Sequence, residues 1–240
     1  MRTACVALFS AFAAAQNGLD SPRLGMMLDA AGDARPVLGI SGSATLGDPE
    51  KSAVVSLACS RRFCLFKTET AIVDNEFAAE APPGPALFAF SEHTASLYFP
   101  STRSFVRWKD GAIEPLAIDV PGEILSLRIR PSGNTELAVR RNHGTWIVDA
   151  QNQAIDSLPA NTGPVMLLET GALYTSSNQT ILRRDDGSEI HFPVDAESFS
   201  AMGGGFVQVR TRRATYAIRT ARGRERIFQL PEPSTGNTSP

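Results

Sequence analysis

The stretch "ILSLRIRPSGNTELAVRRNHGTWIVD", residues 124–149, decides the fold class. In the run 124–130, Leu125, Leu127 and Ile129 alternate with polar residues, which is the two-residue period of a half-buried β-strand. The turn-forming sequences "PSG" and "NHG" separate this run from two further strand-like runs, "TELAVR" and "TWIVD". Short strands joined by tight turns are therefore expected here, without a helix between them.

The same order recurs along the chain. Residues 86–118, 165–192 and 199–230 each read as four short strands separated by turns. The last hairpin of each unit has a turn at Gly111, Asn152, Gly187 or Gly223, which gives steps of 41, 35 and 36 residues. An earlier hairpin over 25–38 turns at Gly32, and the step length predicts one further turn of this kind near Glu69.

A period near 38 residues with four strands per unit is typical of propeller blades. The sequence therefore predicts an all-β fold, a β-propeller of about five four-stranded blades plus an N-terminal hairpin, over residues 24–230. A pair of β-sandwich domains is the alternative, because turns every 8 to 12 residues fit both folds.

Two tryptophans add to this pattern. Trp108 and Trp146 stand near the ends of expected third strands, each followed closely by an aspartate, Asp110 or Asp149. In its architecture the chain resembles exported bacterial β-propeller proteins, loosely of the WD-repeat and YVTN type. The resemblance implies a fold for 24–230 but no ligand, since neither a YVTN tetrapeptide nor a quinone or haem motif is present.

Residues 1–15 have the pattern of a secretory signal peptide. A basic start at Arg2 is followed by the apolar run 4–15, which ends in small residues, Ala13 and Ala15, before Gln16. The run is shorter than the ~20 residues that span a bilayer, and a buried N-terminal helix is the alternative reading. We therefore expect a periplasmic or secreted, non-transmembrane protein whose Pro/Ser/Thr-rich tail, 231–240, is disordered.

Cys59 and Cys64 remain in the expected mature chain. A four-residue hairpin loop over 60–63 would place them opposite each other, within reach of a disulfide. Such bonds persist in oxidising compartments, and two buried free thiols are the alternative. The spacing is not that of a zinc site or of a redox C-x-x-C pair.

Charge and motifs exclude several function classes. Lys plus Arg number 23 and Asp plus Glu 25, so the net charge gives no reason to expect a nucleic acid or a membrane surface as partner. The three histidines, His93, His143 and His191, share no metal spacing, and no nucleophile elbow occurs. We therefore expect no metal, no cofactor and no catalytic residue.

The segment 210–226 is the most unusual part of the chain. It holds seven arginines and one acidic residue, Glu225, although the formal net charge of the whole chain is −2. The arginines could protect a solvated strand edge from pairing, or they could form a docking surface for an anionic partner. The candidate anion-binding or partner-binding residues on the expected strands are Arg210, Arg212, Arg219, Arg224 and Arg226.

These observations favour a binding or scaffold protein outside the cytoplasm, with an unknown protein or an acidic polysaccharide as partner. The alternative is a propeller hydrolase or lyase acting on a glycan or an ester, which would need carboxylates or histidines to converge at one mouth of the ring.

Because arginine is almost never fully buried unless paired, we expect an open or loosely closed ring at the last unit. The other possibility is that the N-terminal hairpin, with Asp29 and Asp33, closes the ring there.

Overall fold

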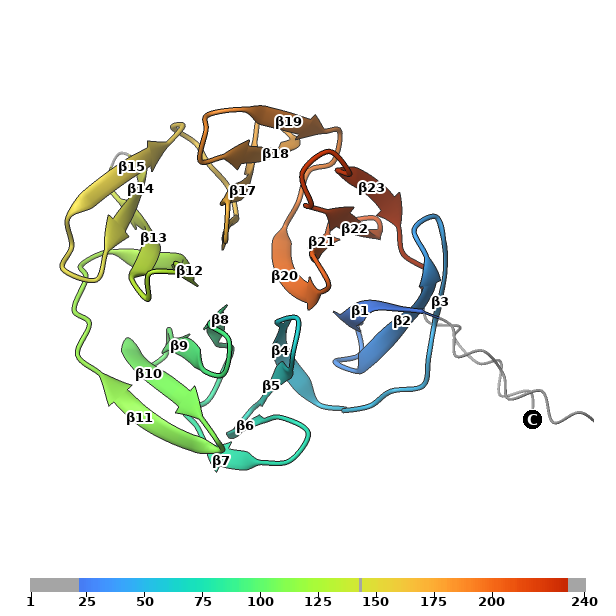
Figure 1. The fold of residues 1–240 in the computed structure, drawn as a ribbon, viewed down its shortest axis with the longest axis horizontal. Helices are drawn as coiled ribbons and strands as arrows, with labels where there is room; N and C mark the ends of the chain where they lie inside the picture. The colour runs from blue at the N-terminus through green and yellow to red at the C-terminus, as the bar shows by residue number, and fades with distance from the viewer. Residues whose placement is uncertain (1–21, 143, 233–240) are drawn as a thin grey trace, which may run out of the picture.

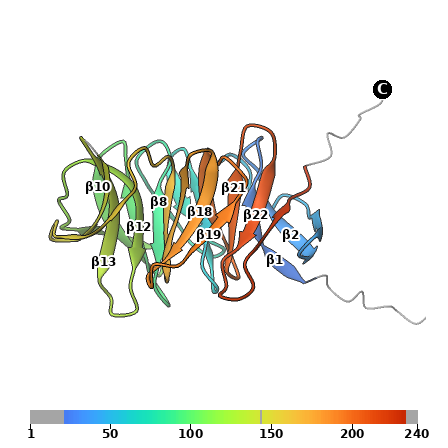
Figure 2. The same cartoon turned by 90° about the horizontal axis from the view of Figure 1, so that it is seen from above.

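The computed structural model describes residues 22–142 and 144–232, in which all regular secondary structure is β-strand. The sheets stand side by side around a central axis (Figure 1) and form a disc whose strands run roughly along its short axis (Figure 2). This all-β ring confirms a propeller-like arrangement and excludes the pair of β-sandwich domains. The expected signal peptide and residues 233–240 of the tail lie outside the described residues.

The strands form antiparallel sheets in chain order, with the first strand of each four-stranded unit nearest the axis (Figure 1). The N-terminal sheet has three strands: β1 (Arg23–Leu28), β2 (Ala34–Ile40) and β3 (Ser43–Leu46). Three separate sheets have four strands each: β8 (Leu87–Phe90), β9 (Ala95–Phe99), β10 (Ser104–Lys109) and β11 (Ala112–Leu116); β12 (Glu123–Ile129), β13 (Thr135–Arg141), β14 (Gly144–Asp149) and β15 (Ala154–Leu158); and β16 (Val165–Leu168), β17 (Gly171–Ser176), β18 (Gln179–Arg184) and β19 (Glu189–Phe192).

The remaining eight strands form one sheet: β4 (Val54–Cys59), β5 (Cys64–Thr68), β6 (Ala71–Val73), β7 (Ala78–Glu80), β20 (Ser198–Gly203), β21 (Phe206–Arg210), β22 (Thr215–Arg219) and β23 (Arg226–Gln229). Its two halves meet through β20 and β4, which pair in parallel at Met202 and Cys59. The expectation of about five separate four-stranded blades is therefore met only in part.

A β-bulge corrects the expected alternation in the run 124–130. The register of β12 on β13 shifts between Ile124 and Ser126, so Leu125 is the extra residue. As a result Ile124 joins Leu127 in the core on one side of the sheet, whereas Leu125 packs against the core on the other side. A bulge depends on pairing with the neighbouring strand, and a two-residue period cannot reveal it.

The predicted hairpin turns are confirmed except for one. Gly111 and Gly187 adopt the left-handed φ values of 79° and 82° that favour glycine in such turns. A turn does lie near Glu69, but it joins β5 to β6, so the prediction that it belongs to the last hairpin of its unit is wrong. The last hairpin of that unit instead turns at 74–77, where the carboxylate of Asp74 accepts hydrogen bonds from the main-chain N–H groups of Glu76 and Phe77.

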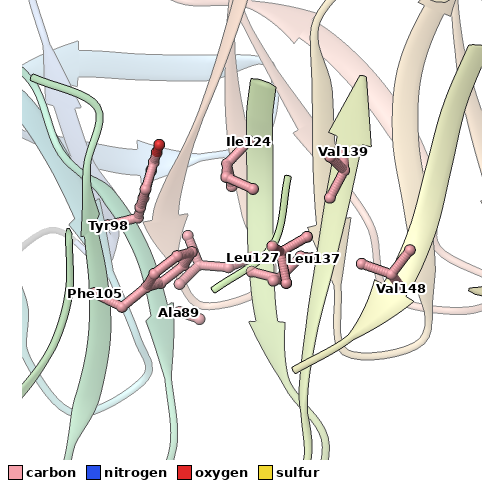
Figure 3. Close-up of a cluster of buried hydrophobic side chains, with 9 residues drawn as sticks. Ala89, Tyr98, Phe105, Ile124, Leu127, Leu137, Val139 and Val148 are labelled. Atoms are coloured by element: carbon pink, nitrogen blue, oxygen red, sulfur yellow. The ribbon is translucent and has the colours of Figure 1, made fainter. Parts of the chain in front are cut away.

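Each boundary between neighbouring sheets encloses its own hydrophobic cluster. Figure 3 shows the cluster between the β8–β11 and β12–β15 sheets, where Tyr98 and Phe105 lie opposite Leu127 and Leu137. Full burial of side chains of this size stabilises a fold by roughly 1.5–3 kcal/mol each. The ring is therefore held together by packing between sheet faces, because few main-chain hydrogen bonds pass from one sheet to the next.

The N-terminal sheet fills the gap between the two halves of the eight-stranded sheet. Met26 on one of its faces packs with Leu57 and Phe66 of β4 and β5. Met27 on the other face packs with Met202 and Phe206 of β20 and β21. The expected open or loosely closed ring is therefore wrong, since apolar side chains on both faces of the N-terminal sheet close it.

Strand β1 occupies the position of a second strand. It starts beside the β20–β21 turn, where a Cβ on Gly204 would lie 3.2 Å from the carbonyl oxygen of Leu24, and it ends at Leu28 beside Gln208 of β21. It therefore runs in the direction of β21 and opposite to β20 and β4, all of which it contacts, and the three-stranded sheet corresponds to the outer three strands of the other units. The innermost strand is missing there, and β4 and β20 approach each other in its place (Figure 1).

Candidate functional site

The five candidate arginines lie at two opposite ends of the disc. We call the end at which β4, β8, β12, β16 and β20 begin the entry end, and the other the far end. Arg210 and Arg212 lie at the entry end, at and just beyond the C-terminus of β21. Arg219, Arg224 and Arg226 lie at the far end, around the β22–β23 hairpin. The structure therefore divides the segment 210–226 into two groups that cannot act on one small ligand.

At the entry end, Arg210 and Arg212 both contact other parts of the protein. The Nη2 of Arg210 donates hydrogen bonds to the main-chain carbonyls of Leu28 at 2.9 Å and of Asp29 at 3.1 Å. Arg212 is exposed and pairs with Glu197 at 3.1 Å. The carboxylates of Asp29 and Asp33 both bind Arg35, so it is the main chain of the N-terminal sheet that receives Arg210.

The far-end group contains a pair of like charges. Arg219 and Arg226 are direct partners across β22 and β23, and Arg219 is in turn the partner of Phe206 across β21 and β22. The guanidinium of Arg219 lies 5.7 Å from the centre of the Phe206 ring, within the range of a cation–π contact. In the part of the chain that the structure describes, no carboxylate lies within 4.0 Å of the guanidinium nitrogens of Arg219 or Arg226.

The carboxylates nearest in sequence to this pair are already used. Glu225 binds the buried Arg184 at 2.6 Å, which lowers its availability to Arg224 and Arg226 on either side. Asp186 binds the exposed Arg222 at 2.9 Å. Arg219, Arg224 and Arg226, which we call the far-end arginine cluster, therefore keep an excess of positive charge.

A cavity of about 250 Å³ lies on the axis at the entry end. Its walls come from the first strands of the units, with Leu28, Gln208 and Arg210 added where the N-terminal sheet lacks its innermost strand. Both Val55 and Leu125 line it, and each is the extra residue of a bulge in its strand. Bulges commonly redirect a side chain in this way.

Serine hydroxyls in this cavity join one unit to the next. Ser56 accepts a hydrogen bond from the N–H of Ala86, and Ser126 accepts one from the N–H of Leu167, both at 2.9 Å. Ser200 donates to the carbonyl of Leu57 at 3.0 Å. These hydroxyls therefore contribute to the contacts that hold the ring together.

A buried ion network was missed by the sequence analysis. Glu136 on β13 binds Arg128 at 2.6 Å and Arg130 at 2.8 Å, and both arginines reach Asp185 in the next unit. Arg128, only 5% exposed, also donates to the carbonyls of Leu168 and Gly171 at 2.8 Å. The alternation of 124–130 put Arg128 and Arg130 on one face, and Glu136 follows on the next strand as the direct cross-strand partner of Arg128, so this pair could have been found in the sequence. Asp185, in the next unit, lies far away in sequence and could not.

The network shifts the acid–base behaviour of Asp185. Partial burial alone would raise the pKa of this carboxyl group, but hydrogen bonds from Arg130 and the positive charges of both arginines lower it below its ordinary value. Ion-pair networks that join structural elements commonly shift pKa values in this way.

The cysteine prediction is confirmed. Cys59 and Cys64 form a disulfide, with Cα atoms 4.0 Å apart, across the first hairpin of the β4–β7 half-sheet. Ser60 and Phe63 close the four-residue loop through a main-chain hydrogen bond of 2.9 Å. The loop lies at the far end, and the disulfide joins directly paired positions of β4 and β5.

The histidines that the structure describes do not converge. His93 lies in an exposed turn and contacts Arg62, whereas His191 lies on the outer strand β19 beside Gln179. His143 lies outside the described residues. Among residues 22–142 and 144–232, no three His, Cys, Asp or Glu side chains form a group that could hold a metal ion, and no helix is long and apolar enough to cross a bilayer.

The ring of antiparallel sheets with their first strands at the axis defines the chain as a β-propeller. No protein-family model matches the sequence, and no curated protein is similar to it. Among solved structures, the fold is similar to one in the crystal structure of a nidogen/laminin complex, with a TM-score of 0.54 and 11% identity over 87% of this chain and 93% of that chain. This likeness supports the propeller fold alone.

Two further structures have lower scores. A streptogramin B lyase structure matches with a TM-score of 0.49 and 13% identity over 89% of this chain and 85% of that chain. PorZ, a surface component of the type-IX secretion system of Porphyromonas gingivalis, matches with a TM-score of 0.49 and 12% identity over 88% of this chain. The present chain spans 38% of the length of the PorZ chain.

Proposed function

We propose that this β-propeller is an extracytoplasmic binding module, and that its far-end arginine cluster docks an acidic polysaccharide. The observation that carries the proposal is the direct cross-strand pairing of Arg219 with Arg226. Like charges placed opposite each other on a sheet are destabilising. An anionic group lying between the two guanidinium groups would remove that repulsion.

The chemistry of the cluster supports this ligand class. Arginine binds carboxylate and sulfate-like groups through a planar fork of donors, and its guanidinium is more weakly hydrated than the ammonium of lysine. The Phe206 ring supports Arg219 from one side, which reduces the side-chain entropy lost on binding. An acidic protein surface is the alternative partner. The shortest anionic chain that still binds the cluster would distinguish a polysaccharide partner from a protein partner.

Binding to heparin as salt is raised tests the proposal. Affinity is expected to fall steeply with salt, because exposed charges are screened beyond ~8 Å at physiological ionic strength. Arg219→Ala and Arg226→Ala should each weaken binding several-fold. Arg107→Ala is the matched control, because Arg107 is an exposed strand arginine in another sheet and has Glu114 as its partner. Heparin binding that changes neither with the salt concentration nor with the two far-end substitutions would contradict the proposal.

Arg226→Glu separates the ligand role from a structural role. The new carboxylate would face Arg219, and opposite charges at such a position stabilise a sheet by roughly 0.2–1 kcal/mol. The variant should therefore be at least as stable as the wild type and yet lose heparin binding. A variant that binds heparin as tightly as the wild type would remove the cluster from consideration.

Export is part of the same proposal. It rests on the signal-peptide pattern of residues 1–15 and is compatible with the Cys59–Cys64 disulfide, since such bonds persist in oxidising compartments. N-terminal sequencing of the protein from its native host should give a mature chain that starts near Gln16. A soluble cytoplasmic product that retains Met1 would refute it.

We also infer that the two halves of the eight-stranded sheet act as separate blades. The strand pairing between them is limited to Met202 with Cys59, whereas neighbouring strands within each half pair over several residues. The ring would then have five four-stranded blades and one three-stranded blade.

The alternative of a hydrolase or lyase has no specific support, because no histidine or carboxylate is found in the described lining of the axial cavity.

A further inference from the structure

The axial cavity at the entry end combines apolar walls with a single charge. Its lining includes Val55, Leu125 and Phe199, and Val55 is 39% exposed although it lies on an inner strand. Arg210 is the one charged residue among the described residues that line it. A cavity of this composition suits a ligand with an apolar body and one negative group.

Arg210 retains donors that the protein does not use. Both of its hydrogen bonds to the described residues come from Nη2, which donates to Leu28 and Asp29. No bond from Nε or Nη1 to another described residue is formed, and no carboxylate in the same residues lies within 4.0 Å of the guanidinium. Because the Nη2 bonds hold the side chain in place, the other donors are preorganised for a ligand in the cavity.

The other polar groups of the cavity are largely occupied. The hydroxyls of Ser56, Ser126 and Ser200 bond to the main chain of neighbouring strands. The amide of Gln208 bonds to both main-chain groups of Leu28. An incoming ligand would therefore meet one charged donor group, at Arg210, the hydroxyl protons of Ser56 and Ser126, which only accept in these bonds, and apolar side chains elsewhere.

We propose that this cavity binds a small amphipathic monocarboxylate. Its carboxylate accepts hydrogen bonds from Nε or Nη1 of Arg210, and its apolar body lies against Val55, Leu125 and Phe199. The volume of about 250 Å³ is slightly below the usual range of ligand sites, about 300–1,000 Å³, so the ligand is a short fatty acid or an aromatic acid rather than a larger molecule. The site is distinct from the far-end arginine cluster, which lies at the opposite end of the disc.

The missing innermost strand of the N-terminal sheet creates this site. In a complete unit a first strand would cover Leu28, Gln208 and Arg210 and separate them from the axis. Instead β4 and β20 pair only at Met202 and Cys59, toward the far end, and leave the gap open at the entry end. The charged end of β21 therefore faces the axial cavity.

Octanoate is the probe for this proposal, with octanamide as its neutral analogue and inorganic phosphate as an anion without an apolar body. In isothermal titration of the full chain, octanoate should bind at least about ten-fold more tightly than octanamide, because a hydrogen bond to a charged group contributes that much. Phosphate should not compete with it. Equal binding of octanoate and octanamide, no binding of octanoate, or displacement by phosphate would each overturn the proposal.

Two variants locate the site. Arg210→Met should reduce octanoate binding about ten-fold or more and leave octanamide binding nearly unchanged. Since this variant also loses the bonds to Leu28 and Asp29, Val55→Phe provides a second test, because it fills the cavity from an exposed position on β4. It should abolish binding of both probes, whereas Ile40→Phe, an exposed change on β2, should not. Wild-type octanoate affinity in Val55→Phe would overturn the proposal, and unchanged octanoate affinity in Arg219→Ala would separate this site from the far-end cluster.

Discussion

The side-chain amide of Gln208 forms two hydrogen bonds with the main chain of Leu28. Its oxygen accepts from the Leu28 N–H at 3.0 Å, and its nitrogen donates to the Leu28 carbonyl at 2.8 Å. These are the two bonds that a neighbouring strand would make with a residue of β1. Gln208, only 3% exposed, therefore supplies at one point the peptide group of the missing innermost strand.

Replacing Gln208 with leucine should destabilise the ring closure. The substitution keeps the size of the side chain but leaves the part-buried N–H of Leu28 without an acceptor and removes one of the donors to the Leu28 carbonyl. A buried polar group that loses its partner costs roughly 1–3 kcal/mol. Urea unfolding should show a lower midpoint with an unchanged slope. Gln229→Leu, on the exposed outer strand β23, is the control and should change the midpoint little. Equal stability of the two variants would show that the amide does not replace a strand.

Removing the disulfide should cost stability without unfolding the protein. The bond joining Cys59 and Cys64 closes a small loop, for which the chain-entropy contribution is about 2 kcal/mol. The double variant Cys59→Ala/Cys64→Ala should therefore unfold at lower denaturant concentration. A reductant should shift the wild-type midpoint in the same direction and leave the variant unaffected. A reductant-independent wild type would contradict the assignment of a stabilising role.

The buried network between the β12–β15 and β16–β19 sheets should depend on Glu136 far more than on Asp185. Glu136→Gln leaves the buried Arg128 without its main counter-charge, and breaking such a pair costs roughly 3–5 kcal/mol. Asp185 is about half exposed and its pairs are screened by solvent, so Asp185→Asn should cost about 1 kcal/mol or less. Chemical denaturation of both variants measures the difference. Similar losses would mean that solvent reaches Arg128 more freely than its contacts indicate.

The pH dependence of the Asp185 contribution has a defined sign. Because the folded-state pKa of this carboxyl is lowered, its contribution is present above the ordinary value near 4 and is lost as the pH falls below it. The wild type and Asp185→Asn should therefore converge in stability at acid pH. A difference that grows as the pH falls would contradict the direction of the shift.

Tyr174 should contribute to loss of stability in alkali. Burial, together with the charge of Glu189 and a hydrogen bond to it of 3.1 Å, raises the pKa of the Tyr174 hydroxyl from 10.0 to about 12. Between these values the unfolded chain releases the proton and the folded chain keeps it, so stability falls as the pH rises. Tyr174→Phe should remove up to about 1.4 kcal/mol per pH unit of this slope.

Unfolding measured from pH 9 to pH 12 tests this prediction, and Tyr216→Phe is the matched control on a half-buried strand position. An ultraviolet titration should also show a tyrosine that ionises near pH 12, and this step should be absent in Tyr174→Phe. An unchanged slope in Tyr174→Phe would mean that the hydroxyl ionises in the folded state as it does in the unfolded chain.

The strands, most of the hairpin turns and the disulfide could be predicted from the sequence. These depend on residues close together in the chain: the alternation within 124–130, the glycines at 111 and 187, and the loop between Cys59 and Cys64. The repeat length predicted the propeller class, because units of four short strands bury their faces only by packing against one another, and the ring of sheets excludes the alternative of two β-sandwich domains.

The way the ring closes and the roles of several arginines could be seen only in the tertiary structure. Closure depends on Met26 and Met27, which pack on opposite sides of the N-terminal sheet against strands from both ends of the chain. Arg210 donates to the main-chain carbonyl of Leu28, 182 residues away, so local charge counting could not distinguish Arg210 from Arg219 and Arg226, which face each other across β22 and β23. The reason is physical: a strand's period shows which face a side chain takes, but the groups that pack against that face come from a neighbouring sheet and are set only when the ring closes.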